Sequence, residues 1–203
     1  MPLEQTIEEE LRRAGFSAVC GVDEAGRGPL CGPVVAAACI LPDGVVPQGL
    51  NDSKKLTPKK RDALFDEIRR VAVAYSVAEA SVEEIDELNI LEADLLAMRR
   101  AIEGLQVPAD YALIDGNIAR DFSIPARAVI HGDAISPSIA AASILAKVTR
   151  DRECEELDRL YPQYGIAKHK GYGTKAHMDA LRQYGPSPIH RKKFIRFLDD
   201  ADR

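Results

Sequence analysis

Apolar residues follow two different patterns along this chain. Short runs rich in β-branched residues predict buried strands, whereas apolar residues that recur every three or four positions predict amphipathic helices. The strand pattern occurs in five segments, residues 18–23, 34–41, 71–78, 111–115 and 127–131. The helix pattern occurs in three segments, residues 57–70, 81–104 and 136–160, the second of which holds one or two helices. This mixture predicts an α/β protein.

Local signals mark the ends of the predicted helices. Thr57 and Ser136 each precede a proline, so each supplies an N-cap while the proline takes the first helical position. Gly104 ends the middle helical segment, and Tyr161-Pro162 ends the last one. Because the first turns of the last helix are rich in alanine, we expect this helix to lie close against a sheet.

The order of the segments predicts how the strands pair. The link between the first two strands, residues 25–33, is rich in glycine and proline and is too short for a helical crossover. These strands should therefore be antiparallel neighbours, whereas the later strands are joined by helices. The prediction is a five-stranded mixed sheet flanked by helices, in one domain that spans residues 1–203.

Composition narrows the class of protein. A chain of 203 residues with 46% hydrophobic residues is long enough for one compact domain with an ample core. The polar start of the chain and the absence of a long apolar run predict a soluble, cytoplasmic protein that does not enter a membrane. The four cysteines form no C-x-x-C pair, which favours reduced thiols over a zinc site or a disulfide framework.

Charge is distributed unevenly around the net value of −5. Residues 163–196 contain eight basic residues and one acid, with tyrosines between them, and belong to a basic C-terminal extension that covers about residues 162–203 and is helical or irregular. Such a stretch is typical of a surface that follows phosphates. A solvated helical face has the same composition, so both interpretations stand at this point.

Acidic residues follow three of the predicted strands. Asp23 and Asp115 each end a strand and precede a turn, and Asp133 follows the fifth strand. If the first and fourth strands are parallel neighbours, Asp23 and Asp115 meet at the carboxyl edge of the sheet, where ligands of α/β proteins bind. The alternative is that these acids are turn formers and helix caps, with Asp133 capping the helix that begins near Ser136.

With Glu24, these acids make a set of four carboxylates. At contact distance each pair would repel by roughly 4 kcal/mol with an effective dielectric near 20. Either the pKa values of the acids rise or a divalent cation neutralises them. Oxygen ligands without His or Cys favour Mg or Mn over zinc, and two such ions can activate water for phosphodiester hydrolysis.

The turn Gly26-Arg27-Gly28 follows the first two acids. It is a poor match to a nucleotide-binding loop, because no G-x-G-x-x-G pattern follows and prolines remove amide donors. Its glycines instead let the backbone approach a sugar-phosphate strand closely.

Six segments in order carry a resemblance to a known family. The chain is similar to bacterial ribonuclease HII over about residues 19–191, on the following motifs: Val22-Asp23-Glu24-Ala25-Gly26-Arg27-Gly28, Asp52-Ser53-Lys54-Lys55-Leu56, Ile114-Asp115-Gly116-Asn117, Gly132-Asp133, Ser138-Ile139-Ala140-Ala141-Ala142-Ser143-Ile144-Leu145-Ala146-Lys147-Val148-Thr149-Arg150-Asp151 and Lys170-Gly171-Tyr172-Gly173-Thr174-Lys175-Ala176-His177. One departure is Ile135, where the family commonly has lysine.

The resemblance implies a ribonuclease H-like fold and Mg- or Mn-dependent cleavage of RNA in RNA/DNA hybrids, including 5′ to a single ribonucleotide in duplex DNA, leaving a 3′-hydroxyl and a 5′-phosphate. It implies roles for ten residues. The metal-binding catalytic acids would be Asp23, Glu24, Asp115 and Asp133. The groups that read the ribose 2′-hydroxyl would be Gly26, Arg27 and Gly28. Tyr172 would pack on the following deoxyribose, and Lys54 and Lys147 would hold phosphates.

Partners and alternative functions follow from the same resemblance. The expected partners are an RNA/DNA hybrid and ribonucleotide-containing duplex DNA. The protein is expected to act on them as a monomer. The apolar tail Phe194-Ile195-Arg196-Phe197-Leu198 either binds a partner such as a replication clamp or packs on the domain. Two alternatives remain: a general hybrid nuclease without junction specificity, and a nucleic-acid-binding module without catalysis.

Overall fold

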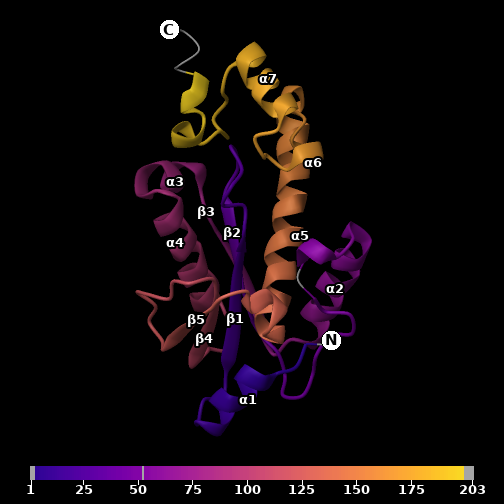
Figure 1. Cartoon of the computed structure of the whole chain (residues 1–203), viewed down its shortest axis with the longest axis vertical. Coiled ribbons are helices and arrows are strands. Elements are labelled where there is room, and N and C mark those ends of the chain that lie inside the picture. Colours follow the sequence, from indigo (N-terminus) through magenta and orange to yellow (C-terminus); the bar gives the residue numbers. More distant parts are fainter. Residues whose placement is uncertain (1–2, 52, 199–203) are drawn as a thin grey trace.

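A five-stranded mixed sheet forms the centre of the computed structural model, which describes residues 3–51 and 53–198 (Figure 1). The strand order is β3-β2-β1-β4-β5. The strands are β1 (Val19–Ala25), β2 (Val34–Ile40), β3 (Ala74–Ala80), β4 (Tyr111–Asp115) and β5 (Ala126–Val129). Strand β2 pairs antiparallel with both β1 and β3, whereas β1–β4 and β4–β5 are parallel pairs. The predicted mixed sheet is confirmed.

Helices cover both faces of this sheet. They are α1 (Thr6–Arg13), α2 (Pro58–Val71), α3 (Val82–Leu88), α4 (Ile90–Glu103), α5 (Pro137–Leu160), α6 (Ile166–His169) and α7 (Lys175–Tyr184). Figure 1 shows α3 and α4 on one face and α5 and α2 on the other. Side chains alternate along β2 accordingly: Ala36 and Ala38 belong to the core under α4, while Ala37 and Cys39 belong to the core under α5 and α2.

The first turns of α5 lie directly on β1, as the alanine content predicts. Ala140, Ala141 and Ala142 are fully buried there. A Cβ on Gly21 would lie 2.1 Å from the backbone nitrogen of Ile139, so only glycine permits this approach of helix and strand. This contact brings the middle of α5 close to the acidic end of β1.

Several boundaries differ from the sequence predictions, among them the end of β1, which continues two residues past Asp23 to Ala25. Helix α2 continues through Val71, because the N–H of Ala72 still bonds the carbonyl of Ile68, so β3 begins at Ala74. Strand β5 ends at Val129, two residues early. The segment 81–104 forms two helices, one of the two outcomes that the prediction allowed; they are separated at Asn89, whose φ of +86° breaks the helical path. Helix α1 was not predicted.

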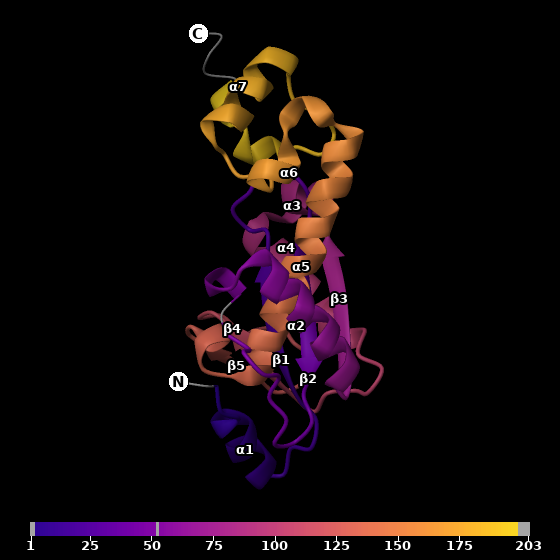
Figure 2. The same cartoon turned by 90° about the vertical axis from the view of Figure 1, so that its right-hand side faces the viewer.

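The chain after α5 packs with the end of α5 and the loop after β1 into a smaller apolar cluster, at the end of the molecule opposite α1 (Figure 2). Its buried members are Cys31, Cys154, Tyr164, Ile166, Leu181 and Ile195. Phe197 and Leu198 pack against the same cluster, so the apolar tail contacts the protein itself.

The cysteines and the helix lengths complete the description of the fold. All four thiols are free and buried. Among the described residues, no helix combines the length and the apolar character that crossing a membrane requires.

Candidate active site

Two acids extend from the end of β1 toward opposite sides of the sheet. Successive side chains of a strand alternate, so Asp23 faces α5 while Glu24 faces α4. Asp23 is buried, and one of its oxygens accepts a 2.7 Å hydrogen bond from the N–H of Glu24. Ser143 of α5, whose hydroxyl is 2.9 Å from that of Ser53, lies beside the Asp23 carboxylate and acts to lower its pKa. Helix α5 therefore orients the first predicted acid.

Asp115 lies at the corresponding end of the parallel neighbour β4. It comes one residue after Ile114, which pairs with Val22, just as Asp23 comes one residue after Val22. Its Oδ1 accepts a 2.7 Å hydrogen bond from the N–H of Gly132, the residue before Asp133. The predicted meeting of strand ends at the carboxyl edge is thus present, with the short helical turn Gly132–Ala134 held against it.

The alternative role of Asp133 as a helix cap is wrong. Helix α5 is capped by Ser136, whose hydroxyl accepts a hydrogen bond from the N–H of Ile139. Asp133 is buried in the turn before that cap. It directly follows Gly132, whose N–H bonds Asp115, so it lies beside the acidic end of β4.

Electrostatic repulsion within the acidic site is strong. Burial raises the pKa of Asp23 well above its ordinary value, and the charges of Glu24 and Asp115 raise it further, against the opposing hydrogen bonds. The donors are carboxylate oxygens, the ligands that Mg and Mn prefer. A divalent cation fits this set of residues because it would relieve the repulsion that burial strengthens.

Asp94 is a further acid at the site that the sequence prediction missed. It lies on α4 and is only 2% exposed, and its Oδ2 is 3.4 Å from Nε of Arg27. Arg27 also approaches Glu24, with Nη1 3.5 Å from Oε1. Burial raises the pKa of Asp94 to about 8, and Glu24 raises it while Arg27 lowers it. The available signal was an acid on the buried side of an apolar helix.

The turn Gly26-Arg27-Gly28 has steric reasons for both glycines. Gly26 has a φ of +100°, and a Cβ there would lie 2.0 Å from Nε of Arg150. A Cβ on Gly28 would lie 3.3 Å from the ring of Tyr172. The turn therefore packs between the buried Arg150 guanidinium and the Tyr172 ring. Arg150 lies in the motif at residues 138–151, but it is not among the ten residues for which the resemblance implies a role.

A cavity of about 370 Å³ joins these features. Its lining is Asp23, Glu24, Ala25, Gly26, Arg27, Gly28, Ser53, Lys54, Ser143, Lys147, Arg150 and Tyr172. Eight of the ten predicted site residues are in this set, while Asp115 and Asp133 lie outside it, at the neighbouring strand ends. The Nζ of Lys147 is 2.6 Å from Asp151.

The basic extension is only partly a surface. Arg191, which contributes to its charge, is 0% exposed. Lys175 and Arg182 both pair with Asp179. The prediction that this stretch presents its bases to solvent is therefore wrong for Arg191, whose role is structural.

Comparisons with known proteins agree with this geometry. Residues 20–197 match the family model described as Ribonuclease HII. A Ribonuclease HII of Desulfitobacterium hafniense is 57% identical over 195 residues, which is 96% of this chain and 75% of that protein.

Two solved structures are also similar. The ribonuclease H2 from Pyrococcus horikoshii OT3 has a TM-score of 0.75 and 30% identity, over 91% of this chain and 98% of that chain. The ribonuclease HII in the PCNA:RNase HII complex from Archaeoglobus fulgidus has a TM-score of 0.74 and 26% identity, over 88% and 95%. The fold is that of ribonuclease H, and the chain belongs to the ribonuclease HII family of enzymes.

Proposed function

We propose that this protein cleaves the RNA strand of RNA/DNA hybrids and cuts duplex DNA 5′ to a single embedded ribonucleotide, leaving a 3′-hydroxyl and a 5′-phosphate. Family membership supports the reaction class. One observation carries the junction specificity: a single cavity is lined by two acids, the turn Gly26-Arg27-Gly28 and Tyr172.

The turn and the tyrosine suit the two sides of an RNA-to-DNA junction. The glycines let the backbone approach a sugar closely, and backbone amides of the turn would donate hydrogen bonds to a 2′-hydroxyl that deoxyribose lacks. The Tyr172 ring packs beside Gly28 and is still 49% exposed. An aromatic face at that position would stack on a sugar without a 2′-hydroxyl, next to the ribonucleotide.

The four acids Asp23, Glu24, Asp115 and Asp133 would hold Mg or Mn. Bound divalent cations supply an activated water and stabilise the leaving oxygen of the phosphodiester. The protein contributes the orientation of the ligands, since Ser143 holds Asp23 and the Gly132 N–H holds Asp115. Lys54 and Lys147 line the same cavity and would hold phosphates of the substrate strand.

The test compares two duplexes of one sequence, with either a single ribonucleotide or an all-RNA strand. In Mg or Mn, the wild type should cut the first duplex 5′ to the ribonucleotide. Tyr172→Ala should slow that cut by about tenfold, the value of one stacking contact, and should affect the all-RNA strand less. Tyr184→Ala, at a comparably exposed tyrosine (54%), is the matched control.

Two results would contradict the proposal. A folded wild type that cuts only the all-RNA strand would be a general hybrid nuclease. A folded wild type that cuts neither duplex, with no metal-dependent heat in calorimetry, would be a binding module. Equal losses on both duplexes in Tyr172→Ala would remove the junction-reading role from that residue alone.

A clamp contact through the tail is a separate part of the proposal. The Archaeoglobus fulgidus relative was solved in complex with PCNA. In this chain Ile195, Phe197 and Leu198 pack in the C-terminal apolar cluster. Binding a clamp through these side chains would therefore require them to leave that cluster, which makes a weak contact the expectation.

A further inference from the structure

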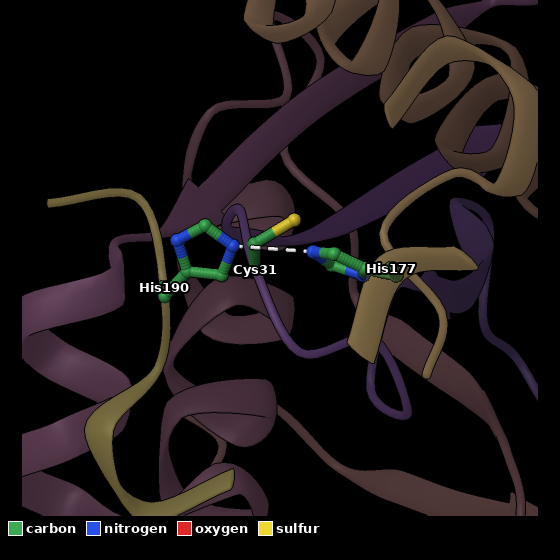
Figure 3. A group of neighbouring side chains, drawn as sticks. All are labelled: Cys31, His177 and His190. Atoms are coloured by element: carbon green, nitrogen blue, oxygen red, sulfur yellow. Dashed lines mark hydrogen bonds between the residues drawn. The ribbon is translucent and has the colours of Figure 1, made fainter. Parts of the chain in front are cut away.

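Three buried side chains outside the acidic site lie close enough to resemble a metal site. Cys31, His177 and His190 each offer a ligand atom, and these atoms lie within 4.8 Å of one another. Figure 3 shows that they come from the loop after β1, helix α7 and the C-terminal segment. The hydrogen bonds around the two imidazoles decide whether a cation fits.

The partners of the imidazoles fix the position of each proton. Nδ1 of His190 accepts a hydrogen bond from the N–H of Ser187, which can only donate. Nε2 of His190 therefore carries the proton and donates across 3.1 Å to Nε2 of His177 (Figure 3). Nδ1 of His177 in turn donates to the carbonyl of Tyr172. Both rings are neutral, and the four ring nitrogens have partners.

This arrangement does not fit a cation. A metal on Nε2 of His190 would have to displace the proton that the Ser187 contact places there. The guanidinium groups of Arg150 and Arg191 also lie near the Cys31 thiol, where their positive charge opposes the binding of a metal cation. The group is instead a chain of hydrogen bonds that runs from Ser187 to the backbone of Tyr172.

Arg191, the residue after His190, contacts the loop that contains the turn Gly26-Arg27-Gly28. Its guanidinium is buried and uses all five of its N–H groups. The acceptors are the carbonyls of Gly26, Arg27, Pro29, Gly32 and Pro33, at 2.6 to 3.1 Å. One side chain therefore holds the whole loop after β1.

These hydrogen bonds set the direction of the amides in the turn. In a trans peptide the N–H points opposite to the carbonyl of the preceding residue, and the chain has no cis peptide bonds in its described part. Since the Gly26 and Arg27 carbonyls point to the buried guanidinium, the N–H groups of Arg27 and Gly28 point away from it. These are the donors that a 2′-hydroxyl would meet.

Backbone hydrogen bonds also link the C-terminal segment to the loop after β1, and that loop to the residue before Tyr172. The N–H of Arg191 donates to Leu30, and the N–H of Gly32 donates to Ile189. The N–H of Leu30 donates to Gly171, the residue before Tyr172. The segment 187–191 thus contacts the turn directly through Arg191, and it is linked to Tyr172 through His190 and then His177.

We propose that Arg191 and His190 are positioning residues, which fix the turn Gly26-Arg27-Gly28 and Tyr172 relative to each other so that the cavity distinguishes ribose from deoxyribose. This role rests on the proposed function of the turn and of Tyr172. It predicts that changing either residue weakens discrimination between sugars, beyond any loss of fold stability.

The experiment measures a ratio of binding constants. All proteins carry Asp115→Asn to prevent cleavage, and fluorescence anisotropy gives the Kd for two duplexes that differ by one 2′-hydroxyl. Arg191→Lys keeps the charge, but its three donors lie on one atom, so it cannot hold all five loop carbonyls. It should reduce the preference for the ribonucleotide duplex by about tenfold, the value of one lost hydrogen bond.

Two controls separate positioning from stability. Tyr164→Phe removes the bond from its hydroxyl to the Gly185 carbonyl in the same apolar cluster, without touching the turn or Tyr172. Arg182→Lys changes an exposed arginine of the same extension. Both should keep the preference of the parent, although Tyr164→Phe should lower Tm.

His190 provides the second arm, which also serves if Arg191→Lys does not fold. His190→Ala removes the donor to His177 and should reduce the preference, while His190→Gln should restore part of it through its side-chain N–H. A retained preference in a folded Arg191→Lys or His190→Ala protein overturns the positioning role alone. The positioning role is also overturned if Tyr164→Phe loses as much of the preference for the ribonucleotide duplex as these variants do. A parent without any preference overturns the proposed function, and the positioning role with it.

Discussion

The two sides of the cavity satisfy their buried polar groups in opposite ways. On the acidic side, burial and neighbouring charges raise the pKa values of Asp23 and Asp94, and Oδ1 of Asp94 has no hydrogen-bond partner among the described residues. On the side of the C-terminal segment, Arg191 uses all five donors, and both nitrogens of His190 are hydrogen-bonded.

This difference separates two tasks. Crowded carboxylates raise the free energy of the apo protein and favour the binding of a cation that neutralises them. A fully hydrogen-bonded network gains nothing from a ligand, but it holds backbone groups in place before the substrate arrives, which reduces the ordering cost of binding. Under the proposed function, catalysis would use the acidic side and discrimination between sugars would use the side of the C-terminal segment.

Removing one acid should produce the largest effect. Asp115→Asn should lower the rate of cleavage at least about a thousandfold, because a lost charged ligand removes several kcal/mol of transition-state stabilisation. Binding of the ribonucleotide duplex should remain, because the turn and Tyr172 are unchanged. Single-turnover kinetics with anisotropy measures both. The control is Asp121→Asn, at an exposed acid beyond β4, which should cleave normally. Normal cleavage by Asp115→Asn would exclude Asp115 from the acidic site.

The satisfied side should be sensitive to acid instead. Burial, with His177, lowers the pKa of His190 to about 4, below the unfolded value near 6.5. As pH falls through 6.5 the unfolded chain takes up this proton first, so the free energy of unfolding decreases by about 3 kcal/mol down to pH 4. Urea titrations of wild type and His190→Gln should show a flatter pH dependence in the variant.

The exposed His131 provides the control for that experiment. His131→Asn suits the left-handed backbone at this position and should keep the wild-type slope between pH 6.5 and 4. If His190→Gln has the same slope as wild type, the imidazole is not held neutral in the folded protein.

The acidic side was predictable because its residues follow local patterns. Asp23 and Asp115 follow apolar runs at the predicted strand ends, and the condition that the two strands are parallel neighbours is met by the pairing of β1 with β4. The chemistry of four carboxylates then indicated a hard cation. Asp94 was missed because it lies within a helix, where the apolar positions around it drew the interpretation toward packing.

The satisfied side could not be predicted from local pattern. Arg191 bonds residues about 160 positions earlier, and composition shows its charge but not its burial. Helix α1 was overlooked although Ile7 and Leu11 are four positions apart and pack on the core, and no local pattern predicts that its Glu8 is buried and accepts hydrogen bonds from Ser136 and Ser138. Val71 fits a strand pattern by itself, so the sequence predicts that the third strand begins there, whereas the hydrogen bonds of α2 continue through it.

Replacing Asp23 by asparagine tests the smallest and most specific consequence of the comparison. The folded pKa of Asp23 lies well above the unfolded value near 3.8, so the folded state loses relative stability as pH rises above 3.8. Without metal at neutral pH, Asp23→Asn should therefore unfold with a free energy about 1 to 2 kcal/mol higher than wild type. The gain should vanish near pH 4, and added Mg or Mn should stabilise the wild type more than the variant.

Asp110 supplies a control with the opposite sign, at the other end of the same strand pair. Partial burial opposes its ionisation, but hydrogen bonds from Ser17 and Ala18 outweigh this and lower its pKa. Its stabilisation is present above the unfolded pKa and is lost as pH falls, so Asp110→Asn should reduce stability at neutral pH. Thermal melts in metal-free buffer would contradict the comparison if both variants shifted Tm in the same direction, because the carboxyl edge of the sheet would then hold no excess repulsion for a cation to relieve.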